Sequence, residues 1–433
     1  MKKAFGLAVG FCAAGFLGFQ AQAEPPALDS VAEAYVKLVL KVGLYDPLYV
    51  DSYYGPEEWR PSDKRPAPVA YPLNQLAREA DSLIARLKGL VDSAPNKLRY
   101  DCLLSQLTAV RGTIDKLSGR KMTFDEESMA LFGTVAPTEA VNTDSLIKQL
   151  DSLLPGTGAI PKRLDSLRAR LVVPAPLVDT VFRTAMNEVR RRSRELLDLP
   201  ADESITMEYV TNQSWGGYNR YQGNGHSLIS INLDMPFYVY DAVGYASHEG
   251  YPGHHVQGLI TEKQFVKDSG WVEFCVFALY TPWAIITEGM ANYSKEVLFT
   301  PSEELDFEVK VLCPLAGLDT SLARIYFGAE KALKALKRAE IGVTRDYLDG
   351  RIDWQEAVRR LTRDVLIDET SAENYVEFYE DFRSYNITYR VGEDLVRRFV
   401  EDSVSAGNMA ARRARYARIL TTPYTPSNLA AGK

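Results

Sequence analysis

The sequence predicts a mainly α-helical fold with a small antiparallel β-sheet. Apolar residues recur at the 3.6-residue helical period over most of the chain, and they alternate as in a β-strand only near its middle. The chain has 433 residues, which is ample for a large core and for one or two domains. We therefore expect helices to build most of the protein and the strands to be confined to one region.

The first 23 residues have the features of a secretory signal peptide. Lys2 and Lys3 precede an apolar run from Ala4 to Phe19, and small residues follow at Ala21 and Ala23, as a signal peptidase requires. The apolar run is too short for a comfortable membrane span. We expect an exported chain, periplasmic or secreted, without a stable membrane anchor after cleavage.

Charge and cysteine content exclude several classes of protein. The formal net charge of −7 would become −9 once the two leader lysines are removed, and no basic stripe is present, so we expect no nucleic-acid partner. Cys102, Cys275 and Cys313 remain after export, and they allow at most one disulfide. Cys275 and Cys313 either pair or stay as free buried thiols.

Helical periodicity dominates the first part of the mature chain. It covers residues 28–44, 73–94, 97–118, 143–154 and 161–171, and it returns over 177–198 after two prolines. This N-terminal helical region, residues 24–172, has no cluster of titratable residues, so we interpret it as scaffold or cleft wall. Residues 173–433 form the predicted catalytic region, and the two regions can equally form one continuous domain.

The period changes at two short segments in the middle of the chain. Residues 204–210 and 227–233 alternate like strands, and the segment between them, Trp215 to Gly225, is rich in turn residues. They predict the small antiparallel sheet. His226 lies at the start of the second segment, and we expect it at the surface rather than in a cleft.

Three of the four histidines lie within eight residues, HEGYPGHH, from His248 to His255. A zinc ion with three protein ligands keeps a position for water and lowers the pKa of that water. A carboxylate next to the first ligand can take the proton of the water. The common H-E-x-x-H spacing is absent here, because Pro252 stands where the second histidine would be.

Pro252 nevertheless indicates how two of these imidazoles can meet. On a straight helix His254 would be rotated roughly 120° from His248, and His255 would lie about 10.5 Å further along the axis. Proline cannot donate to the carbonyl of residue 248 and clashes with it, so the helix should break there, with Gly253 absorbing the unusual backbone. This break would bring His254 to the second ligand position, and His255 is the alternative second ligand.

The pattern H-E-x-x-P-G-H-x-x-Q, here His248 to Gln257, resembles the signature of the bacterial domain-of-unknown-function 885 family. That family is grouped with zinc peptidases of the gluzincin type. The resemblance implies a gluzincin-like helical metallopeptidase architecture, an edge strand that pairs with the substrate backbone, and a third metal ligand, a glutamate, on a later helix.

Two later segments also resemble motifs of this family. TEGMANYSKE resembles E-G-W-A-x-Y-x-E, with methionine in place of tryptophan, which implies Glu288 as the third ligand and Glu296 as a residue that orients a histidine. TYRVGEDL resembles Y-K-x-G, which implies that Tyr389 approaches the metal. Arg390 would then grip a substrate carboxylate.

Together these features predict an exported metallopeptidase that binds one Zn²⁺ ion through His248, His254 and Glu288. Glu249 would act as general base on a zinc-bound water, and Tyr389 or His255 would stabilise the oxyanion. The expected partner is a peptide or a small amide. One alternative is a zinc-dependent amide hydrolase that acts on cell-wall fragments or another small molecule. A second alternative is a non-catalytic helical binding protein that retains the metal site.

Overall fold

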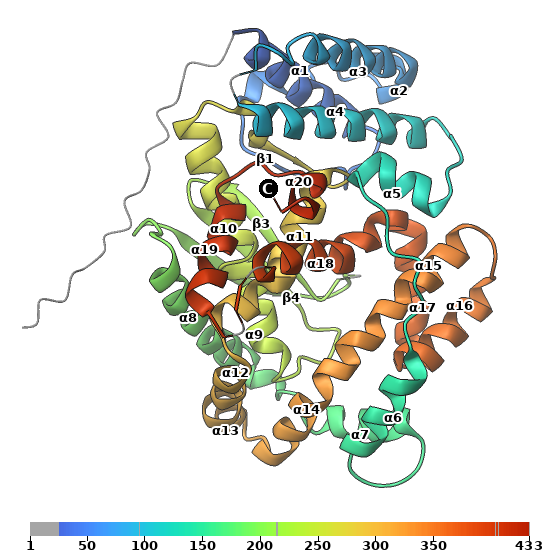
Figure 1. Cartoon of the computed structure of the whole chain (residues 1–433), viewed down its shortest axis with the longest axis vertical. Helices are drawn as coiled ribbons and strands as arrows, with labels where there is room; N and C mark the ends of the chain where they lie inside the picture. The colour runs from blue at the N-terminus through green and yellow to red at the C-terminus, as the bar shows by residue number, and fades with distance from the viewer. Residues whose placement is uncertain (1–25, 95, 214, 403, 406, 433) are drawn as a thin grey trace, which may run out of the picture.

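The computed structural model describes residues 26–94, 96–213, 215–402, 404–405 and 407–432 (Figure 1). The predicted signal peptide, residues 1–23, lies outside these ranges. Among the residues described, no helix is both long enough and apolar enough to cross a bilayer.

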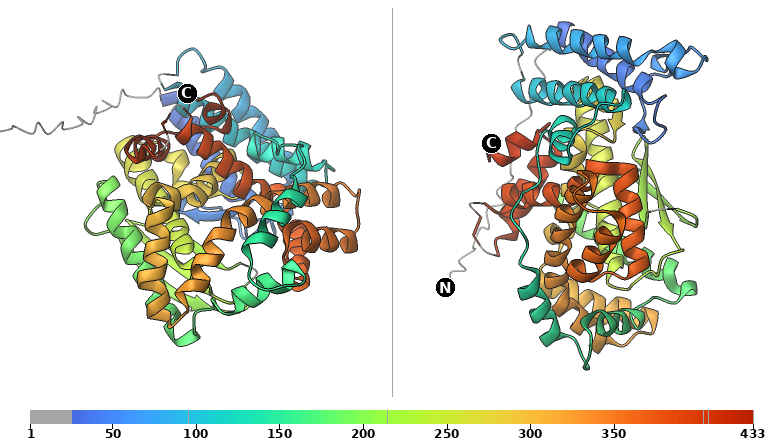
Figure 2. Two further views of the ribbon diagram at one scale, coloured as in Figure 1. Left: turned by 60° about the horizontal axis from the view of Figure 1, so that its bottom comes forward. Right: turned by 90° about the vertical axis from the view of Figure 1, so that its right-hand side faces the viewer.

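Helices build most of the described chain, as the sequence predicts. Three of them, α1 (Pro26–Val42), α3 (Leu73–Lys88) and α4 (Lys97–Leu117), pack together at the top of Figure 1. At the opposite end, α6 (Thr143–Leu153) and α7 (Ile160–Ala169) pack against α14 (Thr320–Leu336). The view turned by 90° in Figure 2 shows the same separation of the two ends. The site-bearing elements lie between them.

The other α-helices fall into two groups in chain order. Those before the first long sheet strand are α2 (Ala67–Ala70), α5 (Phe124–Phe132) and α8 (Val178–Leu196). Those after it are α9 (Asp241–Tyr245), α10 (His254–Ile260), α11 (Pro282–Leu298), α12 (Pro301–Phe307), α13 (Cys313–Ala316), α15 (Glu340–Leu348), α16 (Trp354–Arg360), α17 (Glu369–Phe382), α18 (Ile387–Glu401), α19 (Met409–Leu420) and α20 (Pro426–Ala430).

A three-stranded sheet precedes the histidine cluster. Its order is β2 (Ser204–Val210), β4 (His226–Asn232), β3 (Gly217–Gly223). β3 runs antiparallel to β4 through a two-residue Asn224-Gly225 turn in which both residues have positive φ, 53° and 71°, as a type I′ hairpin requires. The predicted antiparallel sheet is therefore present, but β3 occupies the segment expected to be only a turn.

The pairing of the two predicted strands differs from the expectation. β2 and β4 run parallel, because the β3–β4 hairpin reverses the chain a second time and leaves the far edge of β4 for β2. A separate two-stranded antiparallel sheet joins β1 (Val50–Tyr53) to β5 (Val276–Ala278), and it lies beside β3. β3 is thus an edge strand of its own sheet and is close to a segment from the N-terminal region.

One hydrophobic core spans the two predicted regions. The main cluster of buried apolar residues extends from Leu28 to Leu429 and includes residues on both sides of position 172. Cys102, Cys275 and Cys313 are buried and unpaired, so the alternative of free thiols is confirmed.

α11 and α18 cross in close backbone contact near the site. A Cβ added to Gly289 would lie 2.2 Å from the carbonyl oxygen of Gly392, and one added to Gly392 would lie 2.2 Å from that of Ile285. Only glycine lets the two backbones approach this closely. Thr281 caps the start of α11 by accepting from the amide of Ala284.

Candidate metal centre

The chain breaks between the two predicted histidine ligands. A π-helical turn, Ala246–Gly250, carries His248, the next three residues leave the helix, and α10 begins at His254. The Tyr251–Pro252 peptide bond is cis. The amide of Gly253 donates to the carbonyl of Ser247 at 2.9 Å. The predicted interruption at Pro252 is therefore present, and the chain folds back instead of continuing along one axis.

Gly253 is the residue that makes this close return possible. A Cβ at this position would lie 1.9 Å from the carbonyl oxygen of His248 and 2.4 Å from that of Ser247. No side chain fits such a space, so the backbone of residue 253 passes directly over the preceding turn. His254, the next residue, is thereby held beside His248.

The three predicted ligands, His248, His254 and Glu288, come together. The two imidazole rings are 4.7 Å apart at their centroids and are nearly perpendicular, at 88°. Glu288 Oε2 lies 3.5 Å from His248 Nε2, and Glu288 Oε1 lies 3.7 Å from His254 Nε2. Ligand atoms about 2.1 Å from a tetrahedral zinc ion are about 3.4 Å from one another. The cluster therefore has the dimensions of a metal site.

The electrostatics of Glu288 also fit a bound cation. Its Oε2 atom is buried and has no hydrogen-bond partner within the described ranges, and Oε1 accepts from the Tyr385 hydroxyl at 3.0 Å. Burial alone would raise the pKa of Glu288, but the two histidines outweigh it and hold the pKa well below its usual range. For His254, burial alone would lower the pKa, because it disfavours the charged imidazolium. The Glu288 carboxylate outweighs this effect and raises the pKa of His254 to about 9. A metal ion would satisfy the orphaned oxygen.

Gln257 orients one of the imidazoles. Its Oε1 lies 3.1 Å from His254 Nδ1, and its amide nitrogen donates to the carbonyl of Thr287 at 3.0 Å. This leaves Nε2 of His254 directed at Glu288. Gln257 is the last residue of the H-E-x-x-P-G-H-x-x-Q pattern, but this contact could not be predicted from the pattern alone.

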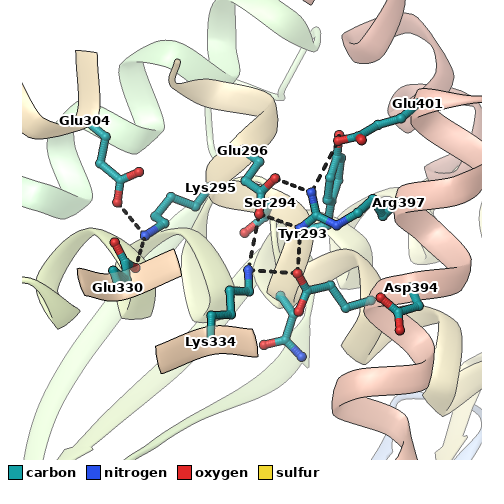
Figure 3. A network of polar contacts seen from close by, with 12 residues as sticks. Tyr293, Ser294, Lys295, Glu296, Glu304, Glu330, Lys334, Asp394, Arg397 and Glu401 are labelled. Atoms are coloured by element: carbon teal, nitrogen blue, oxygen red, sulfur yellow. Dashed lines mark hydrogen bonds and ion pairs between the residues drawn. The ribbon is translucent and has the colours of Figure 1, made fainter. Parts of the chain in front are cut away.

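Glu296 does not orient a histidine, contrary to the sequence prediction. Figure 3 shows its carboxylate facing Arg397, with contacts of 2.5 and 2.6 Å, and Lys334, at 3.2 Å. Glu296 is eight residues after Glu288 on one helix, which places it about 12 Å further along the axis. It belongs to the ion-pair network between α11, α14 and α18.

Glu249, the predicted general base, lies beside the cluster. Its Oε1 is 3.9 Å from His248 Nε2, and the residue is 5% exposed. Asn219 on β3 donates to its backbone carbonyl at 2.7 Å. A Cβ on Gly217 would lie 3.3 Å from Glu249 Oε1 and 2.9 Å from the Tyr245 ring, so β3 needs glycine here to pass close to the carboxylate.

Two tyrosines from the α18 region approach the site. The sequence predicted Tyr389 only, but Tyr385 is the one that donates to Glu288. Burial and then the charge of Glu288 raise the pKa of both phenols well above the usual value, and for Tyr389 the charge of Glu249 adds to this. Tyr389 therefore lies near both carboxylates. Arg390 instead contacts Glu340 at 3.3 Å, so its predicted grip on a substrate is wrong.

His255 cannot take either role considered for it. The ring is fully buried, with Nδ1 2.9 Å from Ser227 Oγ and Nε2 3.1 Å from Glu203 Oε2. Because both nitrogens are occupied, His255 neither binds the metal nor stabilises an oxyanion. His226 is half-buried against the hydroxyls of Ser204 and Thr206, apart from the predicted ligands.

Glu203 connects the two sides of the chain break. Its Oε2 accepts from the Tyr251 hydroxyl at 2.5 Å and is near His255, while Oε1 accepts from Arg190 at 2.8 Å and Arg194 at 2.6 Å. Burial would raise the pKa of Glu203, but these four partners lower it to about 2. A buried, ionised Glu203 thus fixes the residues that flank Pro252 and supports the position of the metal ligand between them.

Comparison with known proteins does not identify a family for this chain. No family model matches the chain, and no curated protein does so either. A crystal structure of a presumed lipoprotein from Colwellia psychrerythraea matches with a TM-score of 0.48 and 14% identity, covering 80% of this chain and 70% of that one. The resemblance to the domain-of-unknown-function 885 family stays a prediction.

Proposed function

We propose that this chain is an exported zinc metallopeptidase of the gluzincin type. The observation that carries the proposal is the convergence of His248, His254 and Glu288, with an orphaned carboxylate oxygen between the imidazoles and Glu249 alongside. Two imidazoles and a carboxylate are a common donor set for catalytic zinc. Export is proposed from the leader sequence alone.

The side chains support hydrolysis of a peptide bond. A zinc ion held by the three ligands would polarise a carbonyl and lower the pKa of a water. Glu249 then removes a proton from the attacking water and delivers it to the departing amine. The Tyr389 hydroxyl donates to the carbonyl oxygen as negative charge develops there. Tyr385 keeps Glu288 in place by its hydrogen bond.

β3 supplies a place for an extended substrate. It is an edge strand, and its Gly217 lies against the Glu249 carboxylate. Addition of a peptide strand to a sheet edge is a general mode of peptide recognition. A peptide along β3 would bring its backbone to the general base.

The proposal is tested by metal analysis together with digestion of a peptide mixture. Wild-type protein should contain one zinc ion per chain and cleave peptides. Glu249→Gln should retain zinc but lose turnover, while Glu57→Gln, at a side chain that is 82% exposed, should behave as wild type. A chain that neither contains zinc nor responds to added zinc would favour the binding protein. Zinc content with hydrolysis only of cell-wall amides would favour the other alternative.

A further inference from the structure

Asp51 on β1 is a carboxylate that forms no ion pair with the residues described. Its Oδ1 accepts from the Tyr218 hydroxyl at 2.6 Å, and no ion pair joins it to a lysine, arginine or histidine in the part of the chain described. The residue is half-buried. Burial raises its pKa, although the hydrogen bond from Tyr218 opposes this. A partly desolvated carboxylate of this kind gains free energy when a cation binds.

This carboxylate lies beside the candidate metal centre. β1 lies beside β3, and Asn219 on β3 donates to the backbone carbonyl of Glu249. The charges of His254 and Glu288 both act on the pKa of Asp51. Asp51 therefore borders the space in which the proposed substrate would bind.

The charges around the zinc-bound site bear on which substrate groups can lie next to Asp51. A divalent zinc ion with two neutral imidazoles and one carboxylate would carry a net charge of about +1, and the neighbouring Glu249 carboxylate would bring the site close to neutral. Arg220, on the same strand as Tyr218, is exposed and adds positive charge. A substrate ammonium is favoured next to a carboxylate that has no ion-pair partner, and Asp51 provides such a carboxylate on β1.

We propose that Asp51 binds a primary ammonium group of the substrate next to the scissile bond. This inference rests on the proposed peptidase function and narrows its substrates. The ammonium has two sources, the free amino terminus of a peptide or a lysine side chain. The first would make the protein an aminopeptidase, and the second would give it a preference for lysine.

Two matched pairs of peptides distinguish these sources. One pair compares a free amino terminus with its N-acetylated form, and the other compares lysine with norleucine in an N-acetylated peptide. Asp51→Asn keeps an acceptor oxygen for Tyr218 and removes only the charge. We expect kcat/KM to fall roughly 10- to 100-fold for the ammonium member of one pair, mainly through KM, and to change little for its neutral partner. Glu57→Gln is the control for a lost surface charge.

Peptide binding to zinc-loaded Glu249→Gln, measured by calorimetry, provides a readout that does not need turnover. The ammonium peptide should bind more tightly than its neutral partner, and adding Asp51→Asn should remove the difference. If Asp51→Asn weakened the binding of both peptides equally, Asp51 would act on the metal centre and not on the ammonium. If both peptides bound Glu249→Gln with equal affinity, there would be no ammonium site. Either result overturns the inference. Zinc-loaded wild type that cleaves peptides without this preference would refute the inference alone, whereas zinc-loaded wild type that cleaves no peptide would refute the proposed function.

Discussion

Replacing Gly253 by alanine should destroy the metal site while the rest of the protein remains folded. The new Cβ would lie 1.9 Å from the carbonyl oxygen of His248, whereas ordinary contacts begin at about 3.4 Å, so the chain must shift by 3.4 − 1.9 = 1.5 Å. Metal–ligand distances tolerate only about 0.2 Å. Because His254 is the next residue, we expect zinc affinity to fall by at least about 100-fold.

The assay is competition for zinc between the protein and a chelator of known affinity, with circular dichroism and thermal denaturation as measures of folding. Gly244→Ala is the matched control, since this glycine lies four residues before His248 and its added Cβ would meet nothing within 4 Å. Alanine there should keep zinc binding and stabilise the helix by up to about 1 kcal/mol. Wild-type zinc affinity in Gly253→Ala would refute the role assigned to this break.

Four further results are expected. Zinc binding at pH 7 should release about one proton, because Glu288 raises the pKa of His254 to about 9 and the ring must be neutral to bind metal; calorimetry in buffers of different ionisation enthalpy counts the protons, and no release would contradict this. In the metal-free protein, the stabilisation from this ion pair should be complete between pH 4.5 and 6.5, the ordinary pKa values of the two groups, and should be lost as the pH rises through 9, which melting temperatures would show. Glu203→Gln should weaken zinc binding roughly 10-fold with little change in secondary structure, and unchanged affinity would exclude its support of the chain break. Gly392→Ala should destabilise the fold by about 1–3 kcal/mol in denaturant unfolding, whereas Gly328→Ala, with nothing within 4 Å of its Cβ, should not.

The sequence was most informative where chemistry and backbone geometry are local. Pro252 and Gly253 lie between the histidines, and their known effects on a helix predict the break that the structure contains. The long helices were predictable because each buries one face, which leaves a regular apolar period. Glu288 was found through its motif and not from any rule of spacing.

The remaining features depend on contacts between distant segments, which leave no local pattern. Asp51 and Tyr218 are 167 residues apart, and Tyr385 and Glu288 are 97 apart. β3 was missed because its glycines, which permit its approach to Glu249, are also typical of turns. In each case the tertiary neighbour, and not the residue's own propensity, determines the structure.

The contact between Gly289 and Gly392 limits how this protein can be redesigned. It joins two main chains with no side chain between them, so no substitution can lengthen or shorten the separation of α11 and α18 in small steps. The residues on these helices that face the candidate centre are held at a fixed spacing. Engineering of substrate preference should therefore begin on β1 and β3, where side chains such as Asp51 and Tyr218 can be exchanged without moving a helix.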